Sequence, residues 1–303
     1  MVRTDGSMKA AKFDYIQAAT VDEVVDALAK GDGEAIVIAG GQTLMPMLSM
    51  RLARPETVID INRIAELSGI EVASAANGDE VVIKACTRQA AALASDIIQT
   101  QLPLLAKAIA YVGHQQTRNR GTVGGSLSHA DPASEIPLTA LTMDAYVRLR
   151  SVAGTRDVAM VDYFLGPMMT ARADNEILLS VHFPTAQTGV RTGTAFHEVS
   201  ELRGDFAVVA AAAVIELDGA GTSTKVALGI GGADGVPKRI TELEEKLRGG
   251  RIDPGGIHAA LGEIADALSP GGDQHAGAAY RRRVAAVLGE RALLEALAEA
   301  ERA

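Results

Sequence analysis

The chain has 303 residues, of which 48% are hydrophobic and 22% charged, a balance typical of a globular protein with about two domains. The formal net charge is −9 and tryptophan is absent, so neither electrostatics nor base stacking favours a nucleic-acid partner. The single cysteine, Cys86, excludes an intrachain disulfide and an iron–sulfur cluster held by four thiolates of this chain.

Two features indicate where the protein resides. No apolar run is long enough to span a bilayer, and the leader MVRTDGSMKAAKFDY lacks the apolar segment of a secretory signal. We therefore expect a cytoplasmic protein with no membrane contact. Cys86 follows the strand-like run VVIKA, which predicts a small core residue with no redox role.

The first 62 residues predict a small βαβ unit. Apolar residues repeat at helical spacing after Thr20, and two short apolar runs flank the turn AGGQ. The expected elements are a helix from a Thr20–Glu23 capping box to the stop at 31–33, a strand at 35–38, a short helix from its cap Thr43 to Met50, and a strand at 57–61.

Residues 63–185 predict mixed α and β structure. The expected elements are strands at 81–85, 146–150 and 156–160 and helices at 87–95, 103–112 and 136–143. The glycine-rich stretch RNRGTVGGSLSHADPASEIP, residues 118–137, is expected to begin as a loop before the last of these helices.

A segment rich in Pro, Thr and Gly, PTAQTGVRTG at 184–193, is the expected domain boundary. Beyond it the pattern predicts an antiparallel sheet followed by helices. The expected elements are strands at 194–200, 206–217 and 224–231 and helices at 241–248, 254–268 and 278–300. The run RRR at 281–283 is interpreted as part of a solvated or subunit-facing helix.

Two glycine turns carry the functional signal: AGGQT at 39–43 and GTVGGS at 121–126. The first lies between a strand and a helix N-terminus, where paired glycines allow close approach and free N–H groups favour an anion. The second adds hydroxyl groups and Asn119, which can hydrogen-bond phosphate or ribityl oxygens. Either turn alone is more simply a tight turn, but the two together favour a phosphate-bearing ligand.

Neither turn matches a common nucleotide fingerprint. No P-loop motif occurs, and GIGGADG at 229–235 has Asp234 where the last glycine of G-x-G-x-x-G belongs. We therefore expect 229–235 to be a hairpin or strand-end turn.

Three stretches, in this order, resemble the FAD-binding medium subunits of molybdenum hydroxylases, the carbon monoxide dehydrogenase and xanthine dehydrogenase superfamily: AGGQTLMPMLSMRLARPETVIDI, RNRGTVGGSLSHADPASEIPLTALTMDA and RGDFAVVAAAAVIEL. The resemblance covers essentially the whole chain. It implies an α+β fold with a two-part α/β FAD-binding domain at 1–185, divided at about residue 62, and a smaller domain at 190–303 with a three-stranded antiparallel sheet and helices.

The resemblance also implies that FAD lies between the two parts of its domain, with its pyrophosphate on the two glycine turns. The first turn would contribute Ala39, Gly40, Gly41, Gln42, Thr43 and Leu44, and the second Asn119, Thr122, Val123, Gly124, Gly125 and Ser126. Asp131 and Glu135 fall where the family has acids near the ribityl and ribose hydroxyls, and Phe206 could pack near the flavin ring.

Several positions depart from the family pattern. Glu135 stands where relatives usually have Asp, and Gln42 where many have His or Asn. Phe206 replaces a frequent Tyr, and the segment HEVSELRGDF lacks the basic run that relatives often carry there. The resemblance therefore assigns no role to a basic side chain in this segment.

Two histidines, His114 and His129, flank the second turn. Either could contact FAD or carry a covalent flavin link, although ordinary polar loop residues are the simpler interpretation. His182 and His197 are expected in strands. No His pair has metal-ligand spacing, so we expect no protein-bound metal.

The resemblance implies that the chain is the FAD subunit of a multi-subunit molybdenum hydroxylase. Substrate would be hydroxylated at a molybdopterin centre on a large subunit, and electrons would pass through [2Fe-2S] clusters on a small subunit to this FAD and on to an external acceptor. A dimer of heterotrimers is the implied assembly, and no residue of this chain need be a catalytic acid or base. The pattern HEVSELRGDF is closest to relatives that oxidise N-heteroaromatic compounds.

Two alternatives stay open at this point. One is a stand-alone FAD-dependent oxidase or reductase with a related fold, which needs its own substrate pocket and proton donor. The other is a non-catalytic nucleotide-binding module that uses the same turns.

Overall fold

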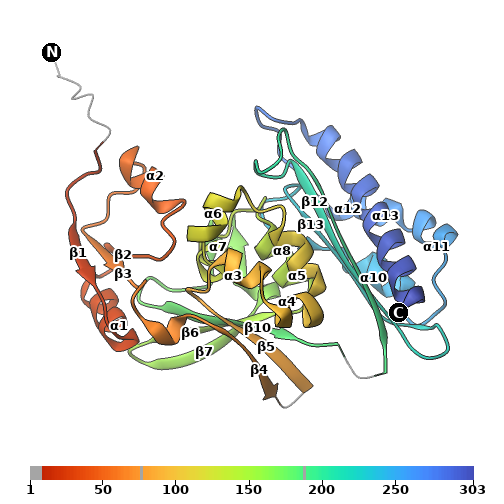
Figure 1. The fold of residues 1–303 in the computed structure, drawn as a ribbon. Helices are drawn as coiled ribbons and strands as arrows, with labels where there is room; N and C mark the ends of the chain where they lie inside the picture. Colours follow the sequence, from red (N-terminus) through yellow and green to blue (C-terminus); the bar gives the residue numbers. More distant parts are fainter. Residues whose placement is uncertain (1–8, 76–77, 187–188) are drawn as a thin grey trace.

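The structure is a computed structural model that describes residues 9–75, 78–186 and 189–303, and its elements form three parts arranged side by side (Figure 1). The first eight residues of the leader, and residues 187–188 of the expected domain boundary, lie outside the described ranges. The α+β fold class is confirmed.

The N-terminal part is a small parallel sheet with strand order β1-β3-β2. Its elements are β1 (Asp14–Gln17), α1 (Val21–Lys30), β2 (Ala35–Ile38), α2 (Leu44–Ser49) and β3 (Thr57–Asp60). The predicted βαβ unit is confirmed, and Thr20 caps α1 by accepting from the Glu23 amide at 3.2 Å. The sequence did not predict β1 because all four of its residues are exposed and show no buried face.

The middle part is built on an antiparallel sheet with strand order β4-β5-β10-β6-β7. Its strands are β4 (Ile70–Ala75), β5 (Gly78–Lys84), β6 (Tyr146–Ser151), β7 (Gly154–Ala159) and β10 (Ile177–Pro184). A one-turn helix, η1 (Ala65–Leu67), precedes the sheet, and α9 (Met160–Tyr163) leads into a short hairpin of β8 (Phe164–Gly166) and β9 (Met169–Thr170).

Six helices accompany this sheet, and all but the fourth, at 115–120, bury side chains in the core against its apolar face (Figure 1). They are α3 (Gln89–Leu93), α4 (Asp96–Gln101), α5 (Pro103–Ile109), α6 (Gln115–Arg120), α7 (Val123–His129) and α8 (Glu135–Thr142). The expected loop after residue 118 is therefore wrong, because Gly124 and Gly125 lie in the first turn of α7. Thr122 caps that turn by accepting from the Gly125 amide at 3.0 Å, which offsets the low helix propensity of glycine.

The C-terminal part is an antiparallel sheet with strand order β11-β12-β13-β14. Its elements are β11 (Arg191–Val199), β12 (Val209–Leu217), β13 (Ser223–Gly231), β14 (Lys238–Arg239), α10 (Thr241–Leu247), α11 (Pro254–Ala259), α12 (Leu261–Ala267) and α13 (Ala278–Arg302). The three expected strands are present, and the two-residue β14 adds a fourth at the edge. Residues 229–235 are the end of β13 and the turn after it, as expected.

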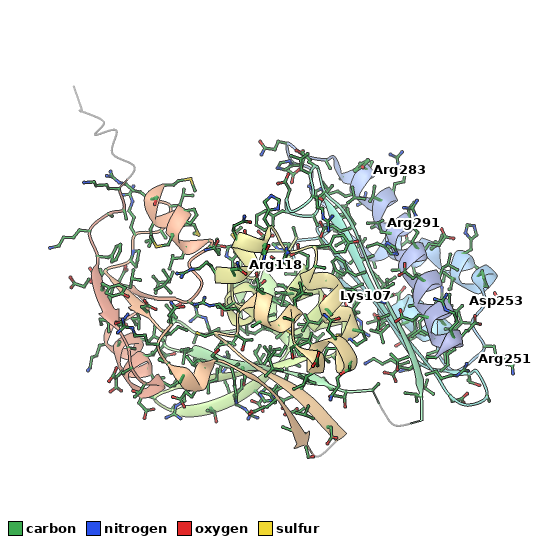
Figure 2. All side chains as sticks on the ribbon, in the orientation of Figure 1. Lys107, Arg118, Arg251, Asp253, Arg283 and Arg291 are labelled. Carbon is green, nitrogen blue, oxygen red and sulfur yellow. The ribbon has the colours of Figure 1, made fainter. Side chains whose placement is uncertain are left out.

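Both faces of the C-terminal sheet are covered, which explains the continuous apolar run of β12. Helix α13 packs along one face, while α5 and α8 of the middle part pack against the other (Figure 1). Lys107 of α5 fastens this contact, donating to the Thr194 carbonyl and to Glu299 Oε2, both at 2.6 Å (Figure 2). The middle and C-terminal parts therefore share a packed interface.

Two details of the C-terminal helices differ from the sequence-based expectation. The single helix expected at 254–268 is broken at Ala260 into α11 and α12. Arg281 is buried, so the solvated reading of the RRR run is wrong at this residue. Its guanidinium donates to the carbonyls of Val208 and Gly232, both at 2.6 Å, and to Asp273 at 2.7 Å.

Candidate functional site

A cavity of about 780 Å³ runs between the N-terminal and middle parts and reaches the C-terminal part. Its volume lies within the range of ligand pockets in proteins. Its lining includes β2, Arg172 and Asp174 on the one hand, and Gly113 and residues 204–206 on the other. Both glycine turns also line it, so the sequence motifs and this cavity coincide.

The first glycine turn presents free backbone donors. Gly41 adopts a φ of 70°, a backbone conformation that favours glycine. Within the described ranges, no protein acceptor binds the amides of residues 40–43. Gln42 folds back so that its Nε2 donates to the Gly40 carbonyl at 3.2 Å. Thr43 occupies the N-cap position of α2 without a side-chain cap bond, so the predicted cap is wrong in that respect.

The second glycine turn offers fewer free amides than the first. Val123 and Gly124 donate to the carbonyls of Thr87 and Ala85, both at 3.0 Å, and Gly125 donates to Thr122 Oγ1. Gly124 is packed so tightly that a Cβ atom on it would lie 2.7 Å from Ala85. This turn therefore presents hydroxyl groups and an accessible Gly125 surface to the cavity, while two of its amides hold it against residues 85–87, just after β5.

Most of the predicted site residues line the cavity. They are Ala39, Gly40, Gly41, Gln42, Thr43, Leu44, Thr122, Gly124, Gly125, Ser126, Glu135 and Phe206. Three predicted residues are not among its lining residues: Asn119 is exposed on α6, Val123 is fully buried in the middle core, and Asp131 Oδ1 accepts from the Ala133 amide at 2.8 Å.

The structure adds lining residues that the sequence did not reveal. Gln89 is buried beside the second turn, and its Oε1 has no hydrogen-bond partner among the described residues. The backbone amide of Gln89 donates to the Gly121 carbonyl at 2.9 Å. The Gln89 side chain therefore reaches the cavity because residues 87–89 pair with 121–123. No local sequence signal announces such a pairing.

The part of the cavity lined by residues 204–206 is shaped by a close contact between segments that are distant in the sequence. Gly204 has a φ of 92°, and a Cβ atom on it would lie 2.6 Å from the His114 ring. Arg118 holds the neighbouring segment by donating to the carbonyls of Val112 and Gly113, both at 2.8 Å (Figure 2). Phe206 is 63% exposed, and His129, the last residue of α7, also lines the cavity.

Two carboxyl groups near the cavity have perturbed pKa values. Burial raises the pKa of Glu135 to about 8, and the nearby charges of Glu198 and Asp131 add to the rise. Burial also raises the pKa of Glu198 to about 7. Of these two, only Glu135 lines the cavity, and its raised pKa favours the neutral carboxyl form at that place in the wall.

The other candidate reactive groups are the Cys86 thiol and clusters of metal-binding side chains. Cys86 is buried as predicted, and desolvation raises the pKa of its thiol to about 11. No group of three or more His, Cys, Asp or Glu side chains among the described residues could hold a metal ion. Over the same ranges, no helix combines the length and apolar character that crossing a bilayer requires.

Comparisons with known proteins identify the family of the chain, and two family profiles together match most of its length. A family profile described as "FAD binding domain in molybdopterin dehydrogenase" matches residues 11–186, and one described as "CO dehydrogenase flavoprotein C-terminal domain" matches 194–296. The 6-hydroxypseudooxynicotine dehydrogenase complex subunit alpha of Paenarthrobacter nicotinovorans is 35% identical over 96% of each chain.

Solved structures of related proteins have the same fold. A chain of carbon monoxide dehydrogenase from Hydrogenophaga pseudoflava superposes with a TM-score of 0.90 at 32% identity, covering 96% of this chain and 99% of that one. A chain of quinoline 2-oxidoreductase from Pseudomonas putida 86 gives 0.88 at 31% identity over the same shares.

Fold and cavity together define a nucleotide-binding flavoprotein of the oxidoreductase class. More narrowly, the chain belongs to the family of FAD-binding medium subunits of molybdenum hydroxylases, and the resemblance seen in the sequence is confirmed.

Proposed function

We propose that this chain binds FAD along the 780 Å³ cavity and relays electrons between a partner subunit and an external acceptor. The observation that carries this proposal is the contact of the two glycine turns, which both line the cavity, together with amides at residues 40–43 that have no acceptor among the described residues. Unpaired backbone N–H groups at a glycine turn are suited to a pyrophosphate, which supplies several acceptor oxygens.

The residues present fit this cofactor. Space beside Gly125 is open apart from Thr122 Oγ1, so phosphate oxygens can approach its backbone. Gln89 Oε1, which has no partner in the described part of the chain, and the carboxyl of Glu135 are suited to sugar hydroxyls, and exposed Phe206 to the edge or face of the ring system. The assigned binding residues are the twelve lining residues named above together with Gln89.

Bound FAD supplies the redox chemistry, accepting and releasing electrons. The residues of this chain bind it and orient its ring end toward residues 204–206, and the raised pKa of Glu135 favours a neutral carboxyl beside it. Asn119, Val123 and Asp131 would act indirectly, by shaping α6, the middle core and the turn before α8.

The assembly we infer contains an iron–sulfur small subunit and a molybdopterin large subunit, arranged as a dimer of heterotrimers in the cytoplasm. A relative is named as a subunit of a dehydrogenase complex, and this chain has one cysteine, which cannot ligate a cluster alone. The pyridine and quinoline compounds in the names of relatives support an N-heteroaromatic substrate, bound on the large subunit. The FAD-binding domain would end near residue 185 and the C-terminal domain begin near 190.

The first test is a visible absorbance spectrum of the purified chain, with chromatography of the flavin released by denaturation. Released FAD supports the proposal, and flavin that stays with the precipitated protein indicates a covalent link and a stand-alone oxidase. A chain that takes up no flavin from excess FAD would show that the proposal is wrong.

The second test is co-expression with the neighbouring genes, followed by metal and cofactor analysis of the complex. Recovery of iron, molybdenum and FAD in one assembly supports the electron-relay role. A flavin-loaded chain that purifies alone and oxidises substrate by itself contradicts it.

A further inference from the structure

The first glycine turn separates two hollows. Residues 39–42 line both the large cavity and a second hollow of about 440 Å³. Asn62 and Arg120 line the second hollow but are not among the residues that line the first. These two side chains therefore contact the turn from the second hollow without lining the proposed FAD site.

A chain of hydrogen bonds joins one turn to the other. Asn62 Nδ2 donates to the Ala39 carbonyl at 2.7 Å, and Asn62 Oδ1 accepts from Arg88 Nη2 at 2.6 Å. Arg88 Nη1 donates to the carbonyl of Arg120. Ala39, the first residue of the first turn, and Arg120, the residue before the second, are thus linked through Asn62 and Arg88.

Asp60 fixes the orientation of the Asn62 side chain. Its Oδ1 accepts from both the backbone amide and Nδ2 of Asn62, at 2.8 and 2.6 Å, and its Oδ2 accepts from the Tyr15 hydroxyl at 2.6 Å. Although burial opposes it, hydrogen bonds from Tyr15 and Asn62 hold the pKa of Asp60 below its usual value. An ionised carboxylate only accepts, so Asn62 must present its NH₂ group to Asp60 and its oxygen to Arg88.

The hydrogen bond from Asn62 Nδ2 to the Ala39 carbonyl determines the direction of the Gly40 N–H group. In a trans peptide the C=O and N–H groups point in opposite directions. Because Asn62 holds the Ala39 carbonyl toward itself, the N–H of Gly40 points away from Asn62, and Gly40 also lines the large cavity. A peptide next to glycine can otherwise rotate at little steric cost, so this bond selects one orientation.

We propose that Asn62 and Arg88 are positioning residues for the pyrophosphate of FAD. They hold the Gly40 N–H toward the cavity and keep the second turn against the first, without being among the residues that line the FAD cavity. This inference rests on the proposed function, because it concerns the same site.

The test compares Arg88→Met and Asn62→Leu with the matched control Arg148→Met. Arg148 also loses hydrogen bonds in that control, two to Asp157 at 2.8 Å, but on a strand that does not line the cavity. The measurements are the dissociation constant for FAD, the melting temperature of the flavin-free chain, and the ³¹P NMR spectrum of bound FAD.

Each of the two variants should weaken FAD binding about tenfold or more, the effect of losing a charge-assisted hydrogen bond. The ³¹P resonances of the bound pyrophosphate should also move, which a purely structural role would not cause. The double variant should lose little more than either single variant, since the two side chains act as one unit. Arg148→Met should leave affinity and resonances unchanged.

Three outcomes overturn the inference. If wild type binds FAD but both variants keep its affinity and ³¹P spectrum, the positioning role is wrong while the proposed function stands. If the variants only lower the melting temperature, the residues are structural. If wild type takes up no FAD, both proposals fail. Arg88→Lys, which keeps the charge and one donor, replaces Arg88→Met if that variant does not fold, and intermediate affinity is then expected.

Discussion

Gly40 lies directly against the carbonyl of Arg120, although the two residues belong to different parts of the fold. A Cβ atom on Gly40 would stand 2.5 Å from that oxygen and 2.9 Å from the Cα of Gly121. The two glycine turns are therefore in backbone contact, and glycine at position 40 is what permits the contact.

Gly40→Ala should force the two turns apart, because both atoms that its Cβ meets belong to backbone. We expect FAD affinity to fall at least about tenfold, with a loss of stability of about 1–3 kcal/mol from overpacking. Titration of flavin fluorescence and chemical denaturation measure the two effects. Gly262→Ala in α12 is the matched control, since a Cβ there meets nothing within 4 Å. Unchanged flavin binding in Gly40→Ala would contradict the contact between the turns.

Gly125→Val should abolish flavin retention for two reasons. A β-branched side chain would fill the space assigned to a phosphate, and its Cβ would lie 2.7 Å from Thr122 Oγ1, the cap of α7. Thr122→Ser keeps the capping oxygen and should retain flavin, which separates blocked binding from a broken cap. The flavin-to-protein absorbance ratio after purification is the measurement. Normal flavin content in Gly125→Val would show that the second turn is misplaced.

The sequence predicted the turns well but not the contacts that assemble them. The resemblance placed residues 39–44 and 121–126 at one ligand, and all of these residues except Val123 line the same cavity. It missed Gln89, Asn62 and Arg88, because their roles depend on the pairing of residues 87–89 with 121–123 and on the end of β3. Contacts of this kind leave no periodicity or local motif in the sequence.

The errors in secondary structure have the same origin. Glycines at 124–125 suggested a loop, yet packing against Ala85 and the Thr122 cap make them helical. Strand β10, at the expected boundary, was predicted only through His182 and without bounds, although it pairs with both β5 and β6 at the centre of the middle sheet. Tertiary pairing decided these segments, whereas the amphipathic helix α1 could be predicted from its own residues.

Glu135→Gln should change how the stability of the flavin-free chain depends on pH. The native pKa of Glu135 is raised from 4.5 to about 8 by burial, so between these values the native state binds more protons than the unfolded state. The free energy of unfolding of wild type therefore falls as pH rises through this window, by at most about 1.4 kcal/mol per pH unit from this group. Glutamine at position 135 does not titrate, so the variant lacks this pH-dependent contribution to the free energy of unfolding.

The variant should accordingly gain stability over wild type as pH rises from 4.5 to 8, with little difference at the acid end. Urea denaturation at a series of pH values measures this. Glu245→Gln, at an exposed position of α10, is the control and should follow wild type. Parallel curves for wild type and Glu135→Gln would show that Glu135 is ionised in the native state.

His182→Phe should destabilise the middle sheet without affecting flavin binding. His182 Nδ1 lies 2.8 Å from Glu80 Oε1 and its Nε2 lies 2.9 Å from Ser180 Oγ, while the Tyr146 hydroxyl donates to Glu80 Oε2 at 2.8 Å. Phenylalanine keeps the stacking on Tyr146 but leaves the buried Glu80 carboxylate with one partner fewer.

Removing one partner of a buried pair costs about 3 kcal/mol, because the remaining charge stays desolvated. Replacing Glu80 by glutamine as well should recover part of this loss, since no charge is then left buried. The urea midpoint measures stability, and FAD affinity should be unchanged because none of these residues lines the cavity. If the double variant is no more stable than His182→Phe alone, lost packing rather than an unpaired carboxylate explains the destabilisation.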